Sequence, residues 1–124
     1  MDKFRLYGLI GYPVSHSYSP YMQNAAFKKL KINARYILFP VVPEKFKRGF
    51  KDVLDLGVSG LNVTIPHKER VVEYLDDISK SVGLIGAVNT IVVKENGRLF
   101  GENTDGKGFV KSFKLNTGKN PKGK

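Results

Sequence analysis

The sequence predicts a three-layer α/β/α fold, in which a mostly parallel β-sheet lies between two layers of helices. Apolar strand-like segments at residues 4–10, 34–42 and 61–65 alternate with helix-like segments. Such alternation is typical of a parallel sheet with helices on its faces. Further along, two strand-like segments flank Asn96-Gly97, a dipeptide preferred in two-residue hairpin turns. The C-terminal hairpin should therefore add an antiparallel strand to the sheet.

The first strand, residues 4–10, has a nearly continuous apolar end, as buried parallel strands do. Gly11-Tyr12-Pro13 ends it, and a helix is predicted from about Pro20 to Lys31. Ser19-Pro20 suits its start, because serine is a good cap and proline fits the first turn. A serine-rich loop at a helix N-terminus can bind an anion. The alternative is that Ser19 only caps the helix.

A second strand is predicted at Ala34–Val42 and a second helix from Pro43 to about Leu56. The apolar stripe of this helix indicates a core-facing side, made of Phe46, Phe50, Val53 and Leu54. Gly57 is a natural helix stop.

The stretch Asn62–Lys68, N-V-T-I-P-H-K, is expected to organise the site. It begins as a strand, and Pro66 should end the strand and start a helix that continues to Leu75. Asn62, Thr64 and Lys68 would then lie at the carboxyl end of a strand, where open α/β sheets bind ligands. A lysine in a first helical turn is unusual, because this end of a helix carries partial positive charge. The alternative is a solvated surface lysine.

A short helix is predicted at Asp76–Leu84, closed by Gly83 or Gly86. The hairpin follows, with strands at 88–95 and 98–104. If its loop has two residues, Asn89 pairs with Thr104, Ile91 with Glu102, and Val93 with Phe100. A last helix is expected from Asp105 to Phe113, with Phe109 and Val110 on its apolar side.

Composition limits the class of protein. The 124 residues are 41% apolar, which suits one modest domain with a core. There is no cysteine, and His16 and His67 show no ligand spacing, so neither disulfides nor a metal site are expected. No apolar run approaches the roughly 20 residues that span a bilayer, and the N-terminus has no signal-peptide pattern. A cytoplasmic protein without membrane contact is expected.

The net charge of +10 is a nucleic-acid signal, but its distribution argues against that function. Residues 107–124 hold six lysines and no acid, while the remainder holds 15 basic and 11 acidic residues. No arginine-rich helix or aromatic-rich strand accompanies them. Nucleic acid is therefore not an expected partner, and the positive field would also suit a small anionic substrate or a phosphorylated cofactor.

Four segments in order resemble motifs of the shikimate dehydrogenase family. They are H-S-x-S-P at 16–20, N-V-T-I-P-H-K at 62–68, A-V-N-T at 87–90 and N-T-D-G at 103–106. The resemblance covers about residues 7–113. It implies an oxidoreductase that interconverts 3-dehydroshikimate and shikimate with NADPH, in the shikimate pathway to chorismate and the aromatic amino acids.

The resemblance also implies substrate-binding residues. Ser17 and Ser19 would bind the substrate carboxylate, a role for which two hydroxyl donors at a helix N-terminus are chemically suited. Ser15 lies outside the motif and receives no role. Asn62 and Thr64 match two further positions of the family's substrate site.

By the same resemblance, Asn89 and Asp105 would bind substrate hydroxyls and Thr104 would contact the substrate. Lys68 would supply the proton that the substrate oxygen needs when hydride reaches the carbonyl carbon. Asp105 would orient Lys68 and the substrate hydroxyl, or take part in the proton transfer.

The sequence has no G-x-G-x-x-G or related glycine fingerprint after a strand, so this chain is expected to bind no dinucleotide. The resemblance places NADP in a second domain of the parent enzyme, together with a closing helical segment, and neither is present here. Residues 1–115 are therefore interpreted as the substrate-binding domain and residues 116–124 as a linker. The isolated chain is expected to be inactive.

Three alternatives stay open at this point. The parent could be a quinate/shikimate dehydrogenase with relaxed cofactor choice, or the chain could be a shikimate-binding module without turnover. A basic nucleic-acid-binding domain is the third, and a salt series would test it. Whether the protein forms a homodimer is also open.

Overall fold

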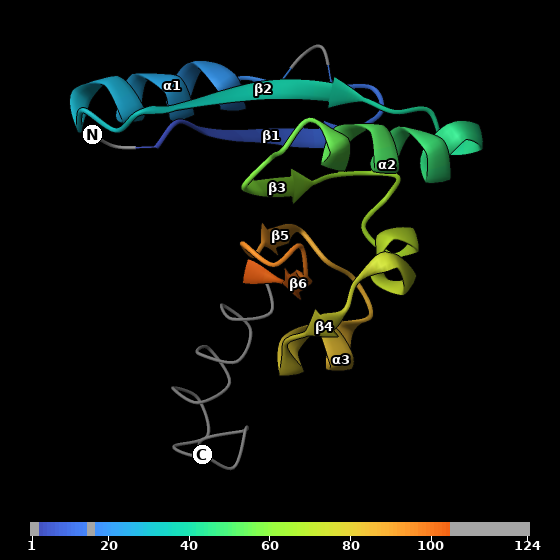
Figure 1. The fold of residues 1–124 in the computed structure, drawn as a ribbon. Helices are drawn as coiled ribbons and strands as arrows, with labels where there is room; N and C mark the ends of the chain where they lie inside the picture. Colours follow the sequence, from blue (N-terminus) through green and yellow to red (C-terminus); the bar gives the residue numbers. More distant parts are fainter. Residues whose placement is uncertain (1–2, 15–16, 105–124) are drawn as a thin grey trace, which may run out of the picture.

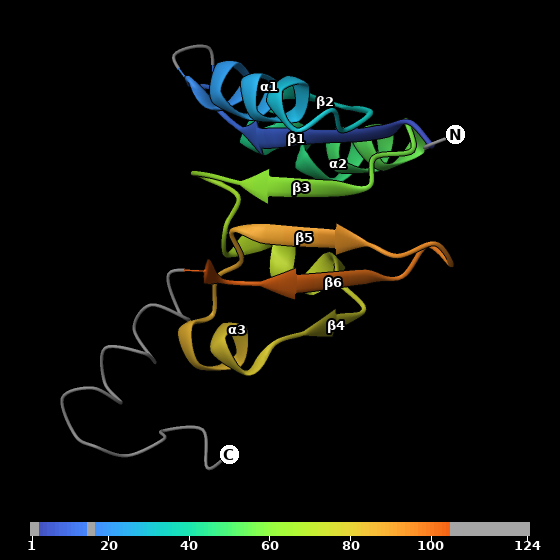
Figure 2. The same cartoon turned by 90° about the vertical axis from the view of Figure 1, so that its left-hand side faces the viewer.

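The computed structural model describes residues 3–14 and 17–104. These residues form a sheet of six strands in the order β2-β1-β3-β5-β6-β4. The strands are β1 (Arg5–Gly11), β2 (Ala34–Pro40), β3 (Gly60–Val63), β4 (Asp77–Ile78), β5 (Thr90–Val93) and β6 (Leu99–Glu102). Within this sheet only β5 runs antiparallel to its neighbours, as Figure 2 shows. The predicted mostly parallel sheet with a hairpin is confirmed.

Helices cover both faces of the sheet (Figure 1). The described helices are α1 (Ser19–Lys29), η1 (Pro43–Lys45), α2 (Phe46–Asp55), η2 (Arg70–Tyr74) and α3 (Lys80–Ile85). The helix α1 lies on one face, beside β2, and α2 with η2 lies on the other. The predicted three layers are therefore present, and the predicted second helix begins as a short 3₁₀ turn.

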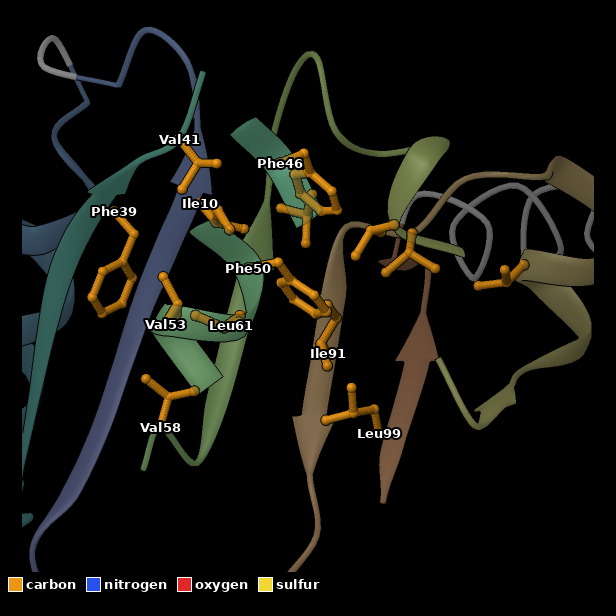
Figure 3. Close-up of a cluster of buried hydrophobic side chains, with 14 residues drawn as sticks. Ile10, Phe39, Val41, Phe46, Phe50, Val53, Val58, Leu61, Ile91 and Leu99 are labelled. Atoms are coloured by element: carbon orange, nitrogen blue, oxygen red, sulfur yellow. The ribbon is translucent and has the colours of Figure 1, made fainter. Parts of the chain in front are cut away.

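The main core lies under α2 (Figure 3). Phe46 and Phe50 of α2 stack with ring centroids 5.4 Å apart, and Phe46 also contacts the ring of Tyr74 on η2 at 5.3 Å. The strands supply Ile10, Phe39, Leu61, Val63, Ile91 and Leu99 to the same cluster. Apolar side chains that alternate along each strand therefore meet one apolar helix face, as the stripe on α2 predicts.

The face under α1 has a smaller apolar cluster. Its buried members are Leu9, Val14 and Tyr36. Tyr7 and Phe27 pack against it, with ring centroids 5.8 Å apart. None of the residues of α1 is itself buried. This helix therefore packs on the sheet through partly buried side chains such as Phe27.

The prediction that a helix starts at Pro66 is wrong. The Ile65–Pro66 peptide is cis, residues 65–69 form turns, and the 3₁₀ helix η2 begins only at Arg70. The His67 N–H donates to the Thr64 carbonyl at 3.1 Å, and the His67 ring is buried against Phe46. A tertiary contact of the side chain thus overrides the local preference for helix.

The region from Asp76 to Leu84 is also only partly helical. Asp77 and Ile78 form β4, which pairs with β6, and α3 follows from Lys80. The Ser79 side chain caps α3 by accepting from the Val82 N–H at 3.3 Å. Gly86 closes the helix in the left-handed conformation, as one of the two predicted stops.

The predicted hairpin register is wrong by one residue. The pairs are Thr90–Glu102, Ile91–Gly101, Val92–Phe100 and Val93–Leu99. The loop has three residues, because Lys94 pairs with Arg98 through a 2.9 Å hydrogen bond and Gly97 adopts a positive φ of 87°. A three-residue loop with glycine in the left-handed region is the next commonest hairpin connection. It shifts the partner of each residue by one.

Among the described residues, no helix is both long and apolar enough to cross a membrane. The predicted helix at Asp105–Phe113 and the predicted linker at 116–124 lie outside the described residues.

Candidate active site

Polar segments meet at the carboxyl edge of the sheet. The strands β1, β2, β3 and β6 all end at this edge, and the antiparallel strand β5 begins there. The loop before α1, the turn after β3, the residues before β5 and those after β6 are consequently neighbours. Ligands bind at this edge in open α/β sheets.

The N-terminus of α1 brings two serines to this edge. The Ser17 hydroxyl accepts a hydrogen bond from the Ser19 N–H at 3.1 Å. The N-cap residue is Tyr18, without a side-chain cap bond, so the prediction that Ser19 caps the helix is wrong. The Ser19 hydroxyl instead hydrogen-bonds to Tyr36.

Tyr36 of β2 carries a buried hydroxyl into the site and was not predicted from the sequence. Its side chain is 4% exposed, and its hydroxyl donates to Asn62 Oδ1 at 2.8 Å. Burial raises the pKa of Tyr36 to about 12, against the opposing effect of the hydrogen bond from Ser19. The phenol is therefore neutral and serves as a fixed hydrogen-bonding group at physiological pH.

Asn62 connects Tyr36 to the start of β5. Its Nδ2 lies 3.4 Å from both the Asn89 carbonyl and Thr90 Oγ1. Thr90 Oγ1 donates to Asn89 Oδ1 at 3.0 Å. Asn62 is thus held by partners at both ends of its amide.

Asn89 and Thr104 are joined through their side chains. Asn89 Nδ2 donates to Thr104 Oγ1 at 2.8 Å, and the Thr104 N–H donates to Asn89 Oδ1 at 3.0 Å. The predicted proximity of the two residues is therefore correct, although the predicted backbone pairing is not. The side-chain amide bridges the one-residue offset.

These contacts form one continuous hydrogen-bonded series, here called the polar row. Its members are Ser17, Ser19, Tyr36, Asn62, Thr90, Asn89 and Thr104. A pocket of about 390 Å³ adjoins it on the α1 face, lined by Tyr36, Asn62 and Thr90 and by apolar residues such as Tyr7, Phe27 and Val92. The row carries hydroxyl and amide groups and no formal charge.

Thr64 and Lys68 lie on the turn after β3, at the same edge. The Thr64 N–H bonds to the Ile10 carbonyl at 3.0 Å, and the Lys68 carbonyl accepts from the Val88 N–H at 2.8 Å, next to Asn89. Lys68 is half-buried. A Cβ on Gly11 would lie 2.2 Å from Thr64 Cγ2, so the turn packs directly on the end of β1.

His67 fastens this turn to the main core. The residue is fully buried, and its Nε2 bonds to the Val41 carbonyl at 2.5 Å, while Nδ1 finds no partner in the described part of the chain. Burial lowers the pKa of His67, the Val41 hydrogen bond opposes this, and the charge of Arg70 lowers it further. The ring is therefore neutral and structural, and it fixes the residue before Lys68.

Of the eight predicted site residues, five belong to the polar row, and Thr64 and Lys68 lie on the adjoining turn; Asp105 lies outside the described residues. Among residues 3–14 and 17–104, no group of three His, Asp or Glu side chains could hold a metal. In the part of the chain that the structure describes, no glycine-rich turn joins a strand to a helix, so these residues do not fit a dinucleotide pyrophosphate.

Comparison with known proteins gives a consistent result. A profile described as the shikimate dehydrogenase substrate binding domain matches residues 9–91. A shikimate dehydrogenase (NADP(+)) from Desulforamulus reducens is 48% identical over 122 residues, which is 98% of this chain and 42% of that protein. The chain thus spans about two fifths of the length of this curated relative.

Two solved structures illustrate the range of similar folds. Shikimate 5-dehydrogenase from Listeria monocytogenes, in complex with shikimate and NAD, is 38% identical with a TM-score of 0.79, over 90% of this chain and 38% of that one. The ligand-free 5-ketofructose reductase of Gluconobacter sp. strain CHM43 is 36% identical with a TM-score of 0.80, over 93% and 41%.

Proposed function

The chain belongs to the family of shikimate dehydrogenase substrate-binding domains, and we propose that its polar row and the adjoining turn bind shikimate and 3-dehydroshikimate. The parent protein would interconvert the two with NADP. The observation that carries this proposal is the polar row, a hydrogen-bonded line of hydroxyls and amides at the carboxyl edge. Such groups match a substrate that carries several hydroxyls and one carboxylate.

The carboxylate is assigned to Ser17 and Ser19. Both stand at the N-terminus of the eleven-residue helix α1, whose partial positive charge favours an anion. The first turn of this helix contains no acidic side chain that would repel one. Tyr36 supports this assignment, because its neutral hydroxyl adds a further polar group beside Ser19 without adding negative charge.

The substrate hydroxyls are assigned to the asparagines and threonines of the site. Asn62, Asn89 and Thr104 offer donors and acceptors that already hydrogen-bond to one another, which keeps their side chains in position before a ligand arrives. Thr64 borders the same edge from the turn after β3. Asp105, which directly follows Thr104 in sequence, is assigned to a further substrate hydroxyl.

Lys68 is assigned the proton transfer. Reduction of the ketone requires a proton at the oxygen that becomes the new hydroxyl, and an ammonium group is a suitable donor. Asp105 would orient Lys68 and the substrate, or share in the transfer. Hydride delivery is assigned to the remainder of the parent protein, because the sequence has no glycine fingerprint for a dinucleotide.

The domain is proposed to span residues 1–115, with 116–124 as the connection to an NADP-binding region. This chain alone would then bind shikimate weakly and would not oxidise NADPH. A homodimer and a cytoplasmic location are compatible with this assignment.

Calorimetric titration of the full gene product with shikimate tests substrate binding. Ser17→Ala should lose a charge-assisted hydrogen bond and weaken binding by about 1.5–3 kcal/mol. Ser81→Ala, which removes a hydroxyl from α3, is the matched control and should bind as the wild type does. Equal affinity of the Ser17→Ala variant and the wild type would remove Ser17 from the site.

Steady-state kinetics test the assignment of Lys68. Lys68→Ala should lower kcat by orders of magnitude while changing substrate affinity much less, because a proton donor acts mainly in the transition state. Near-normal turnover would make Lys68 an ordinary half-buried lysine.

A second candidate is the reduction of another polyhydroxylated ketone, which the similarity to a 5-ketofructose reductase favours. That sugar has no carboxylate, so the two candidates differ at the serines. A substrate panel separates them, with 3-dehydroshikimate and 5-ketofructose tested with NADPH and quinate tested with NADP. If the carboxylates react poorly and Ser17→Ala has no effect, the sugar ketone becomes the better assignment.

A further inference from the structure

Asn24, in the middle of α1, binds the backbone of β2 with both ends of its side-chain amide. Its Nδ2 donates to the Tyr36 carbonyl at 2.9 Å, and its Oδ1 accepts from the Tyr36 N–H at 2.8 Å. In the described sheet, β2 is an edge strand, so these backbone groups have no neighbouring strand to pair with. The carboxamide of Asn24 takes the place of one peptide unit of such a strand.

The residue held by Asn24 is the one that reaches into the site. The backbone of Tyr36 is hydrogen-bonded to Asn24, and its hydroxyl is hydrogen-bonded to Ser19 and Asn62. Asn24 and Ser19 belong to the same helix. The helix α1 therefore touches Tyr36 at two places, and one rigid element sets the distance from the serines to the sheet.

We propose that Asn24 is a positioning residue for the carboxylate-binding end of the site. It fixes the serine-bearing N-terminus of α1 against Tyr36, and through Tyr36 against Asn62. The inference rests on the proposed function only in assigning a carboxylate to Ser17 and Ser19.

The apolar contacts of α1 are less suited to this role. None of the residues of α1 is buried, and the apolar cluster beneath it has only three buried members. Apolar contacts of this kind tolerate sliding, because they are not directional. Paired hydrogen bonds to one residue of β2 permit only one register of the helix on the sheet.

The chemistry of the amide suggests a sensitive variant. Asn24→Asp has the same shape and keeps an acceptor for the Tyr36 N–H, but it places a carboxylate oxygen against the Tyr36 carbonyl. It therefore breaks one of the two bonds without leaving a cavity. Asn24→Ala removes both bonds, and Lys28→Ala, an exposed change on the same helix, is the control.

The test compares the affinities of the full gene product for shikimate and for shikimate carboxamide, which lacks the negative charge. The wild type and Lys28→Ala should prefer the carboxylate by at least about tenfold, the value of one charge-assisted hydrogen bond. In Asn24→Asp and Asn24→Ala this preference should fall below threefold. A variant that is merely less stable would lose affinity for both ligands by the same factor, so an unchanged ratio would overturn the proposal.

NMR spectroscopy tests the positioning role of Asn24 independently of the proposed function. If the wild type does not prefer the carboxylate, the assignment of Ser17 and Ser19 fails, and Asn24 is judged on the ligand-free protein. Amide NMR signals of Ser19 and Asn62 should move in Asn24→Asp and stay in Lys28→Ala. If only signals next to Tyr36 on β2 move, Asn24 does not position the site. Because Asn24→Asp leaves no cavity, this measurement remains available if Asn24→Ala fails to fold.

Discussion

Ile91 and Val92 are neighbours on β5, yet Ile91 is 1% exposed and Val92 is 45% exposed. Ile91 faces the side of the sheet under α2, where fourteen buried apolar residues form one cluster. Val92 lines the pocket on the side of α1, where the apolar cluster has three buried members. The two faces of the sheet therefore differ in how many apolar side chains they bury.

This difference separates stability from recognition. The face under α2 is filled by apolar side chains, whose burial supplies most of the free energy of folding. The face under α1 ends in the polar row, whose groups gain little net stability from their hydrogen bonds but have defined directions. Changes on the first face should therefore affect mainly the free energy of unfolding, and changes on the second mainly the geometry of the site.

The largest loss of stability is expected from Phe46→Ala. Phe46 is fully buried against Phe50, His67 and Tyr74, and removing its ring leaves a cavity that costs about 3–5 kcal/mol. Urea unfolding measures the loss, and Tyr21→Ala on the exposed side of α1 should change it by less than about 0.5 kcal/mol. A loss below 1 kcal/mol for Phe46→Ala would contradict the division between the faces.

An intermediate effect is expected from Gly11→Ala, where the two faces meet the turn that carries Lys68. The new Cβ would lie 2.2 Å from Thr64 Cγ2 and 3.0 Å from the Ile65 carbonyl, and such overpacking costs about 1–3 kcal/mol. Gly83→Ala is the control with the opposite expected sign, because a Cβ at this helical position would meet no atom within 4 Å. It should stabilise the protein by about 0.5–1 kcal/mol. Thermal unfolding of both variants decides whether their shifts differ in sign.

Tyr36→Phe should cost only about 1 kcal/mol, because the ring stays buried and only the hydroxyl is lost. Ser19 and Asn62 would each lose one partner. Urea unfolding should show this modest loss, and Tyr12→Phe at an exposed position should show none. A loss of 3 kcal/mol or more would mean that the polar row is a main source of stability, against the contrast drawn between the faces.

The smallest effect concerns pH. The folded pKa of His67 is lowered below its ordinary value of 6.5, so the unfolded chain binds a proton more readily than the folded one. The contribution of His67 is therefore complete above about pH 6.5 and is lost as the pH falls toward the folded pKa. Between pH 7.5 and 5.5 the free energy of unfolding should therefore decrease as the pH falls.

His67→Gln isolates this term. The pH dependence between 7.5 and 5.5 should become flatter in His67→Gln than in the wild type. Equal slopes for the two proteins would show that the His67 ring titrates alike in the folded and unfolded states.

The sequence predicted the parallel half of the fold because its signals are local. Apolar strand-like segments marked β1, β2 and β3, and the stripe on α2 marked the core-facing side. Five members of the polar row were predicted as site residues. Only the resemblance to a family selected them, since hydroxyls and amides in loops are common.

The failures have tertiary causes or ambiguous local signals. The turn at Pro66 depends on a bond between His67 and Val41, which is distant in sequence. Tyr36 resembled an ordinary strand residue, and Asn24 an ordinary polar helix residue, until their contacts were visible. Asn96-Gly97 fits both a two-residue and a three-residue loop, and the sequence alone does not choose between them.

The polar row also has a consequence for folding. Its members come from segments that are far apart in the chain, from Ser17 to Thr104, and they meet only when β1, β2, β3, β5 and β6 have all assembled. A small molecule bound along the row would contact several of these segments at once and would bind only the assembled sheet. At a hundred times its Kd, such a ligand would add about 2.7 kcal/mol to the stability of the native state. A ligand of this site should therefore raise the free energy of unfolding of destabilised variants, including those whose substitution lies on the opposite face.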